Sequence, residues 1–296
     1  MQTLESQFDL CIVDEASRAT PTEALVPMTR ARRWILVGDP RQLPPFVDDA
    51  TKRKTNLSDY GLTRDQLEGT LLDRMLALLP DECQTALTVQ HRVAPPIGAL
   101  VSECSYGGRL ANGRPDGENP YALVFPHRVT WVTTSGLEDA RERRNGTSVS
   151  NEAEVRTIRN LLKQLDFVAR GKKLHPSVVL LAGYANQCER LERALASLAN
   201  EIKHLDVEVH TVDSFQGREA DVAVYSVTRS NEDRKLGFLG DERRLNVALS
   251  RGRDLLVIVG DTQFCRTARG ENPLKPVLEH VERHVQACEV KDAREL

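Results

Sequence analysis

Short apolar runs alternate with amphipathic segments along the chain. The run from Phe8 to Val13 has the composition of a β-strand, and the runs from Trp34 to Val37 and from Leu87 to Val89 repeat the pattern. Strands that alternate with helices are typical of α/β folds built on parallel sheets. We therefore expect an α/β protein, with further strands at residues 129–133, 178–184, 207–212, 221–227 and 255–259.

Helical periodicity appears between these strands. Asn151 is expected to begin a helix, because Glu154 stands three residues later in the spacing of a capping box. Apolar residues at positions 155, 158, 161, 162 and 165 form one stripe of that helix, and those at 188, 191, 195 and 198 form the stripe of the next. Residues 243–254 predict a third helix with Leu245, Ala248 and Leu249 on its apolar face.

Glycine and proline punctuate the middle of the chain. The stretch at 107–120 is rich in both, and we interpret it as the approach to a second domain. The sequence thus predicts one domain over residues 1–118 and another over 119–296. The polar stretch at 136–150 is expected to be a mobile loop.

Composition limits the classes of protein that remain. The 296 residues carry a net charge of −3, so nucleic-acid contacts would have to come from local basic patches. The six cysteines form no CxxC pair, which leaves a redox or zinc motif without support. No apolar stretch has the length of a membrane span, and no signal peptide is recognisable. We expect a cytoplasmic protein that does not contact a membrane.

Polar residues directly follow several of the expected strands. In parallel sheets, ligands bind beyond the carboxyl ends of the strands, so these residues are expected to share a site. Asp14 and Glu15 end the first strand, where a nucleoside triphosphatase needs one carboxylate for Mg²⁺ and another for the attacking water. The alternative is a common acidic strand end.

The next two motifs offer groups for a phosphate. In GDPRQLPP, residues 38–45, Asp39 faces the expected crevice and Gln42 provides an uncharged donor and acceptor; the alternative is a proline-rich turn. In QHR, residues 90–92, Arg92 follows a strand and could meet a terminal phosphate, although a lone arginine is often a surface residue.

The last two motifs lie in the second half. In VDSFQGREAD, residues 212–221, Gly217 allows a tight turn, and Glu219 could accept hydrogen bonds from ribose hydroxyls. In RRLNVALSRGRD, Arg244 and Arg251 are seven residues apart and are expected on one side of a helix. Such an arginine could stabilise charge on a γ-phosphate, whereas the alternative is a solvated basic face.

Together and in this order, the five motifs resemble motifs II to VI of superfamily 1 helicases, branch 1B. They are most similar to the nonsense-mediated-decay helicase and the replication nuclease-helicase, from about Phe8 to Asp261. The resemblance implies two RecA-like domains, an AAA-type nucleotide-binding protein, hydrolysis of ATP with Mg²⁺, and 5′-to-3′ movement on single-stranded DNA or RNA. It implies catalytic roles for Asp14 (which also holds Mg²⁺), Glu15, Gln42, Arg92 and Arg251. It implies nucleotide binding by Asp39, His91, Gln216, Gly217, Glu219 and Arg244, and nucleic-acid contacts by Thr211 and Ser214.

The chain departs from the family pattern at three places. His91 stands where an aromatic ring usually stacks on the base, and Gly252 replaces a usual alanine, which is expected to loosen the helix end. The phosphate-binding octet GxxxxGK[ST] is absent, since the only Gly-Lys pair, Gly171-Lys172, is followed by lysine. We expect the first domain to lack the strand that carries this loop. We therefore expect the chain to be the C-terminal part of a longer helicase or the partner of an N-terminal fragment.

Other functions compete with a helicase. A decayed helicase kept as a regulatory or binding module would retain the fold, although the preserved acids and arginines argue against it. His280 and His284 could bind Zn²⁺, but Glu282 does not complete an HExxH motif, so we expect a solvated helix face. No carboxylate cluster outside the motifs predicts a nuclease.

Overall fold

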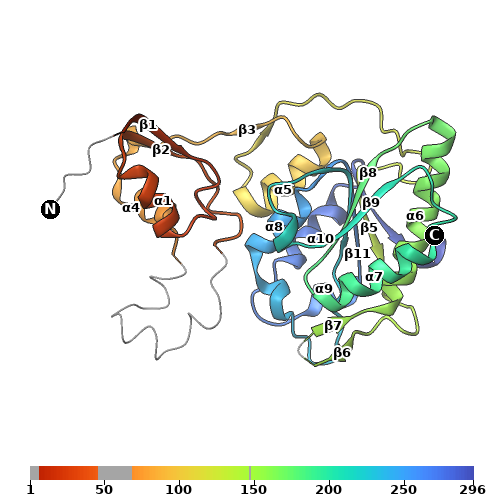
Figure 1. The fold of residues 1–296 in the computed structure, drawn as a ribbon. Coiled ribbons are helices and arrows are strands. Elements are labelled where there is room, and N and C mark those ends of the chain that lie inside the picture. Colours follow the sequence, from red (N-terminus) through yellow and green to blue (C-terminus); the bar gives the residue numbers. More distant parts are fainter. Residues whose placement is uncertain (1–6, 46–68, 147) are drawn as a thin grey trace. The chain divides into compact units, whose positions relative to one another are not determined.

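The computed structural model describes residues 7–45, 69–146 and 148–296, which fall into two compact units. The first unit ends at Leu87 and the second begins at Thr88. In Figure 1, the first unit contains the elements from β1 to α4, and the second contains those from β3 to the C-terminus. No helix of the described residues is long and apolar enough to cross a membrane.

The boundary between the units differs from the one expected at residue 118. The helix α5 (Pro95–Tyr106) belongs to the second unit, because it packs against α8 (Glu242–Leu249) and α10 (Leu274–Arg283). Its apolar side chains Ile97 and Leu100 are fully buried there. The glycine-rich stretch that suggested a linker is therefore a surface segment inside the second unit.

The first unit is built on a two-stranded parallel sheet among its described residues. It consists of β1 (Phe8–Val13), α1 (Pro21–Met28), β2 (Ala31–Leu36), α4 (Leu71–Leu78) and the 3₁₀ turn η1 (Asp81–Cys83). The predicted β1 is confirmed, whereas β2 begins three residues before Trp34.

Local sequence explains both helices of the first unit. Thr20 and Glu23 form a reciprocal capping box at the start of α1, and the Thr70 side chain accepts a hydrogen bond from the Asp73 backbone at the start of α4. Alternate strand residues point to opposite faces of the sheet. One face carries Cys11, Val13, Trp34 and Leu36, and it packs on the core formed by Ala24, Met28 and Leu71.

The other face of this sheet is exposed. Phe8 and Ile12 on β1 are about three-fifths exposed, and Leu10, Ile35 and Val37 are also exposed. Parallel sheets are usually covered on both faces, so this apolar face is an unusual feature of the first unit.

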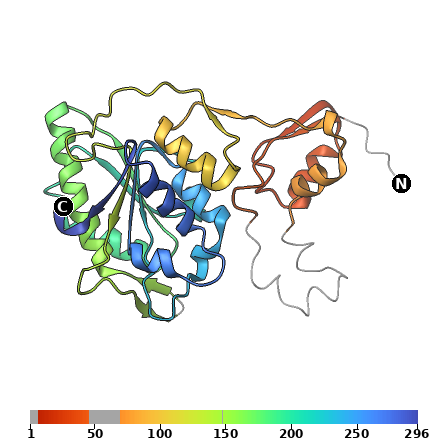
Figure 2. The same ribbon diagram turned by 180° about the vertical axis from the view of Figure 1, so that it is seen from behind.

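The second unit is a six-stranded parallel sheet with helices on both faces (Figures 1 and 2). The strand order is β12-β5-β11-β10-β8-β9. These strands are β5 (Val129–Thr133), β8 (Ser177–Ala182), β9 (Asp206–Thr211), β10 (Ala220–Ser226), β11 (Gly252–Gly260) and β12 (Cys288–Asp292). The prediction of β5 is confirmed residue for residue, those of β8 to β11 to within a few residues, and β12 was not foreseen.

Two layers of helices cover this sheet. On one face lie α6 (Glu152–Lys172) and α7 (Ala185–Ser197), which pack on inward residues such as Val222 and Val224 of β10. On the other lie α5, α8 and α10, with α9 (Thr262–Thr267) beside α10. Both strands and helices thus have the periodicities that the sequence predicted.

Short elements complete the second unit. They are β3 (Val89–Gln90), β4 (Ala111–Asn112), β6 (Arg143–Asn145), β7 (Ser148–Ser150), η2 (Asp213–Phe215), η3 (Gly237–Gly240) and η4 (Ala293–Glu295). β3 begins two residues later and ends one residue later than the predicted Leu87–Val89. The segment expected to be a loop at 136–150 contains the antiparallel pair β6–β7 instead.

Candidate functional site

In the first unit, Asp14 and Glu15 directly follow β1 and are exposed. The Glu15 backbone N–H donates to Asp14 Oδ1 at 2.9 Å, which fixes the first carboxylate over the strand end. Glu15 itself has φ 52°, a left-handed conformation that a residue other than glycine rarely adopts. Such local strain is often found at functional sites, where surrounding structure holds it in place.

The loop after β2 lies against the loop after β1. Ala16 N–H donates to Val37 O at 2.8 Å, and the Asp39 N–H donates to Ser17 Oγ at 3.4 Å. Gly38 permits this approach, because a Cβ there would lie 2.8 Å from the Ser17 backbone nitrogen. The structure therefore brings the VDEAS and GDPRQLPP motifs together.

Asp39 organises its own loop. Its Oδ1 accepts from the Arg41 N–H at 2.9 Å, and its Oδ2 accepts from Gln42 Nε2 at 3.0 Å. The Gln42 amide is thus oriented by Asp39. Both predicted residues lie in the loop that neighbours Asp14 and Glu15.

In the second unit, Arg92 and Glu219 form an ion pair. Arg92 Nε lies 2.8 Å from Glu219 Oε2, although the two residues are far apart in the sequence. Both side chains are about half exposed, at 48% and 47%. An ion pair of this exposure contributes little stability, so it can be exchanged for another partner.

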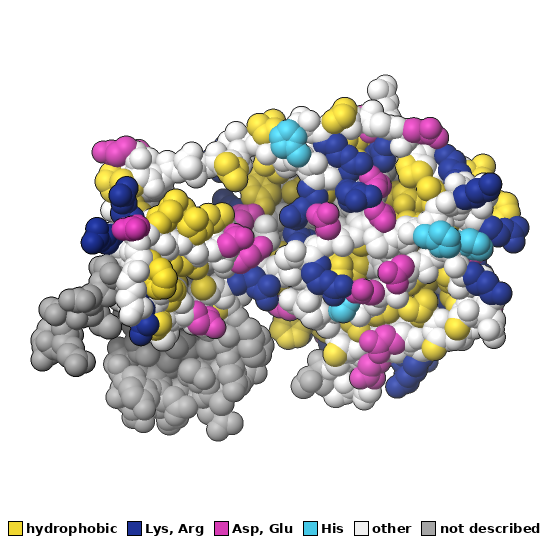
Figure 3. Space-filling model, turned by 45° about the horizontal axis from the view of Figure 1, so that its top comes forward, with side chains coloured by type: hydrophobic (Ala, Val, Ile, Leu, Met, Phe, Trp, Pro, Cys, Tyr) yellow, Lys and Arg dark blue, Asp and Glu magenta, His cyan; other side chains and the backbone are white. Residues whose placement is uncertain are grey.

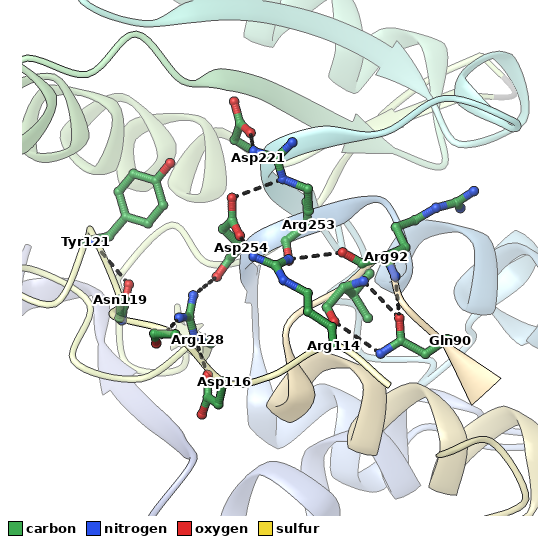
Figure 4. A network of polar contacts seen from close by, with 12 residues as sticks. Gln90, Arg92, Arg114, Asp116, Asn119, Tyr121, Arg128, Asp221, Arg253 and Asp254 are labelled. Carbon is green, nitrogen blue, oxygen red and sulfur yellow. Dashed lines mark hydrogen bonds and ion pairs between the residues drawn. The ribbon is translucent and has the colours of Figure 1, made fainter. Parts of the chain in front are cut away.

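A hydrogen-bond network holds the loop that carries Arg92 (Figure 4). Gln90 Oε1 accepts from the backbone N–H groups of Arg92 and Val93, each at 2.9 Å. Arg114 Nη1 donates to the carbonyl oxygens of Arg92 at 3.0 Å and Arg253 at 2.9 Å. The loop is therefore fixed at its backbone, while the Arg92 side chain points away from the network in Figure 4.

Acidic residues at the amino ends of β10 and β11 anchor this network. Asp254 forms an ion pair with Arg114, and Asp221 forms one with Arg253. Arg253 Nε also lies 3.2 Å from Asp254 Oδ2. Sequence reasoning did not assign a role to Arg114, Arg253 or Asp254, because they act only through contacts between distant segments.

The turn at 216–219 has the conformation that its glycine predicts. Gly217 has φ 80°, so the turn requires a residue without a side chain. Gln216 is 6% exposed, and its Nε2 is a buried donor with no hydrogen-bond partner among the described residues. An unsatisfied buried donor costs roughly 1–3 kcal/mol, so a ligand that accepts from it would relieve that cost.

Arg244 is held by acidic neighbours. It lies on α8 and donates to both carboxylate oxygens of Asp213, at 2.9 and 3.0 Å, and to Asp241 at 3.2 Å. Hydrogen bonding to Asp213 raises the pKa of Arg244 further above its ordinary value. Since Asp213 belongs to VDSFQGREAD, this bidentate pair ties the last two motifs together.

Arg251 is not on the same helix as Arg244, contrary to the expectation from their spacing. Helix α8 ends at Leu249, with Ser250 as its C-cap, because the chain must enter β11. The Arg251 side chain is 1% exposed and donates to Val247 O, Arg218 O and Ser250 Oγ, all within 3.0 Å. These bonds fix it behind the 216–219 turn.

Gly252 also differs from its expected role. It is the first residue of β11 rather than the end of a helix. A Cβ at this position would lie 2.4 Å from Leu255 O, so the backbone of this chain requires glycine here. The glycine therefore accommodates a close backbone approach and does not loosen α8.

The remaining predicted residues lie on the surface of the second unit. The ring of His91 is exposed and covers Gly113, since a Cβ on Gly113 would lie 2.2 Å from it. Thr211 and Ser214 border a cavity of about 310 Å³ between α7 and the end of β9. Thr211 Oγ1 donates to Ser214 Oγ, and Ser214 Oγ donates to Thr211 O, so both hydroxyl protons are engaged inside the turn.

Basic side chains are interspersed with acidic ones near these residues. In Figure 3, Lys and Arg side chains alternate with Asp and Glu side chains over the second unit. Arg218, for example, bonds to Glu208 at 2.6 Å while its guanidinium stacks on Phe215. Glu189 and Glu192 line the cavity beside Thr211. The basic side chain nearest Thr211 and Ser214 in these contacts, Arg218, is therefore paired with an acidic residue.

A buried carboxyl lies beneath the carboxyl end of β10. Glu154 Oε1 and Oε2 accept from Thr228 N–H at 2.9 and 2.8 Å, and Ser226 Oγ donates to Oε2. Burial raises the pKa of Glu154 to about 8, against the opposing effect of these hydrogen bonds. Asn151 does cap α6 as expected, but Glu154 faces the sheet and does not complete a capping box.

Comparison with known proteins agrees with this architecture. Parallel sheets with polar motifs after their strands define the chain as an α/β protein of RecA-like architecture. The chain matches two family profiles described as AAA domain, one over residues 1–50 and the other over residues 67–263. The second match covers more than half of the chain, and the chain belongs to the superfamily 1 helicases, in the branch that its motifs predicted.

Several relatives are helicases by name. The chain is 32% identical to the 5′-3′ DNA helicase ZGRF1 of Mus musculus over 89% of its length. It is 31% identical to the DNA polymerase alpha-associated DNA helicase A of Saccharomyces cerevisiae over 86%, and 30% identical to the DNA replication ATP-dependent helicase/nuclease dna2 of Schizosaccharomyces pombe over 92%. The chain spans only 13%, 38% and 20% of these three relatives.

Proposed function

We propose that the chain forms part of an ATP-dependent helicase or translocase that moves on single-stranded DNA or RNA. The observation that supports this most directly is the pair of carboxylates after β1, set beside the Asp39–Gln42 loop. Hydrolysis of ATP needs one group for the metal and another for water, and this arrangement offers both.

Within the first unit, each residue has a distinct role in this proposal. Asp14 would hold Mg²⁺, which neutralises charge on the β- and γ-phosphates when it is bound. Glu15 is exposed and would orient the attacking water and accept its proton. Gln42, held by Asp39 at 3.0 Å, would sense the γ-phosphate without adding charge.

The second unit provides cations and an unfilled donor. The buried Nε2 of Gln216 fits an acceptor atom of a nucleotide, since no described residue satisfies it. Arg92 would exchange Glu219 for the γ-phosphate, and the released Glu219 would accept from ribose hydroxyls. Arg251 is buried and bonded to the 216–219 turn, so it would act as the second cation at the γ-phosphate only after exchanging its bond to Arg218 O for the phosphate. Arg244 would join the nucleotide site to the 212–221 motif through Asp213. Such an exchange of partners could link nucleotide binding to movement.

The nucleic acid would contact the second unit through Thr211 and Ser214. Their hydroxyl groups bond to each other and to the Thr211 carbonyl, so a phosphate oxygen would have to replace one of these bonds. Exposed arginines such as Arg218 offer the charge that a backbone phosphate requires.

We further propose that the phosphate-binding loop comes from another polypeptide segment. The sequence contains no GxxxxGK[ST] octet, and that loop normally supplies the backbone amides that bind the phosphates. The segment would be an N-terminal part of a longer protein or a separate fragment. The chain by itself should therefore hydrolyse ATP slowly.

An ATPase assay tests the proposal. The chain is assayed alone and together with a separately produced segment that carries a GxxxxGK[ST] loop, with single-stranded DNA and RNA as stimulants. We expect nucleic-acid-stimulated turnover only in the mixture. Glu15→Gln should reduce it by about a hundredfold or more, the usual contribution of a general base. Glu82→Gln, an exposed glutamate of the same unit outside the motifs, is the matched control.

The alternative outcomes are informative. Robust turnover by the chain alone, abolished in Glu15→Gln, would contradict the need for a second segment. A folded mixture that binds nucleic acid but never hydrolyses ATP would favour a regulatory or binding module derived from a helicase.

A further inference from the structure

Three potential metal ligands meet where α5 packs on α10. Glu103 lies on the last turns of α5, His280 lies in the last turn of α10, and His284 is the C-cap of α10. One ligand atom from each lies within 4.8 Å of the others. All three belong to the second unit, and none is a residue of the motifs described above.

His280 is buried rather than solvated, contrary to the expectation from its sequence. It is 2% exposed, and its Nδ1 lies 2.8 Å from Glu103 Oε2. The ring of His284, four residues later on the same side of the helix, stacks on it with ring centres 4.0 Å apart. Neither the third ligand nor this burial is visible from the spacing of the histidines.

Outer hydrogen bonds orient His284 and Glu103. His284 Nδ1 lies 2.9 Å from His280 O; a proton on Nδ1 would donate to this carbonyl and leave Nε2 with a free lone pair. Arg283 Nη2 lies 2.9 Å from Glu103 Oε1 and holds that oxygen, which leaves Oε2 toward His280. Metal-binding histidines and carboxylates are commonly oriented by outer hydrogen bonds of this kind.

The charge of the cluster also suits a cation. The Glu103 carboxylate adds a negative ligand to the two rings. Two imidazoles with one carboxylate form a ligand set that Zn²⁺ uses.

We propose that Glu103, His280 and His284 bind one Zn²⁺ ion, with water completing its coordination. Two ligand atoms at about 2.0 Å from zinc in tetrahedral geometry lie roughly 3.3 Å apart. His280 Nδ1 and Glu103 Oε2 are 2.8 Å apart, so they need to separate only slightly. Coordination through Nδ1 moves the proton of the neutral ring to Nε2.

Such a site would be structural rather than catalytic. It would join α10 to α5, the helix that begins just after the loop carrying Arg92. The metal would therefore stabilise the packing that supports this loop. It would have no part in the hydrolysis of ATP.

Calorimetric titration of the chelator-treated, tag-free full chain with ZnCl₂ tests the proposal. We expect one Zn²⁺ per chain, and a higher melting temperature after addition. His284→Ala and Glu103→Gln should each weaken binding at least tenfold. Because His284 is exposed, its removal should leave the fold intact, as far-ultraviolet circular dichroism can verify. His127→Ala, a histidine outside the cluster, should bind like the parent.

Cobalt provides a second measurement. Co²⁺ bound to the parent chain should give visible d–d absorption that zinc displaces, and this absorption should be lost in His284→Ala. Unchanged zinc affinity in His284→Ala, or no uptake by the parent chain, would overturn the proposal. The cluster would then be a hydrogen-bonded contact between two helices.

Discussion

The position of a side chain in this protein depends on its burial as well as on the sequence motif that contains it. Glu154 illustrates this, because its spacing from Asn151 fits a helix cap while its carboxyl lies under the sheet, 2.8 Å from the Thr228 N–H. Thr228 has φ 69° in a left-handed conformation that a β-branched residue rarely adopts. The contact with Glu154 holds this residue in place.

The raised pKa of Glu154 predicts a stability that depends on pH. The carboxyl titrates at about 8 in the folded chain and near its ordinary 4.5 in the unfolded chain. Between these values the folded state holds an extra proton, so stability is complete below pH 4.5 and falls as pH rises toward 8. The slope is at most about 1.4 kcal/mol per pH unit.

Glu154→Gln should remove this slope, because the amide cannot ionise. The measurement is denaturant unfolding of parent and variant at several pH values between 5 and 8.5. Glu152→Gln, on the same first turn of α6, should keep the slope of the parent. An identical pH dependence for parent and Glu154→Gln would contradict the assignment.

At the scale of elements, contacts between segments decide which motif residues meet. The expected strands and helices agree with the structure because apolar periodicity reflects burial, and β5 agrees residue for residue. Arg251 lies outside α8, because the chain enters β11 at Gly252. The apolar periodicity of the sequence does not reveal where this helix ends. Arg114 and Glu103 were missed because their partners, Asp254 and His280, lie far away in the sequence.

Arg114 provides a test at this scale. Arg114→Ala removes the donors to the Arg92 and Arg253 carbonyls and one of the two ion-pair partners of Asp254, which keeps its contact with Arg253. We expect the second unit to lose about 1–3 kcal/mol of stability. Amide hydrogen exchange should become faster at Arg92 and Val93.

Arg109→Ala is the control for this experiment. Arg109 is exposed, and its Nε makes a hydrogen bond to Tyr106 O at 3.2 Å on the same loop. The Arg109→Ala variant should leave amide hydrogen exchange at Arg92 and Val93 unchanged. Equal protection of these amides in both variants would show that Arg114 does not position the loop.

The whole molecule consists of two units with very different cores. The described core of the first unit centres on Ala24, Met28 and Leu71, whereas the second unit buries a continuous layer between α6, α7 and a six-stranded sheet. Stability rises with the surface that a domain buries, so the second unit should be the more stable one.

This difference predicts two unfolding transitions. Calorimetry should show a first transition for residues up to Leu87 and a second, larger one for the rest of the chain. Limited proteolysis followed by mass spectrometry should release a resistant fragment that begins near Thr88. One cooperative transition with no such fragment would show that the two units unfold together.

The uncovered face of the β1–β2 sheet has a consequence for handling the chain in the laboratory. Four large apolar side chains of the two strands, led by Phe8 and Ile12, are exposed, and Val37 directly after β2 adds a fifth. Contiguous apolar surface of this kind favours association with neighbouring molecules. Preparations of the chain should therefore self-associate as concentration rises, and a covering polypeptide supplied during synthesis should improve the soluble yield.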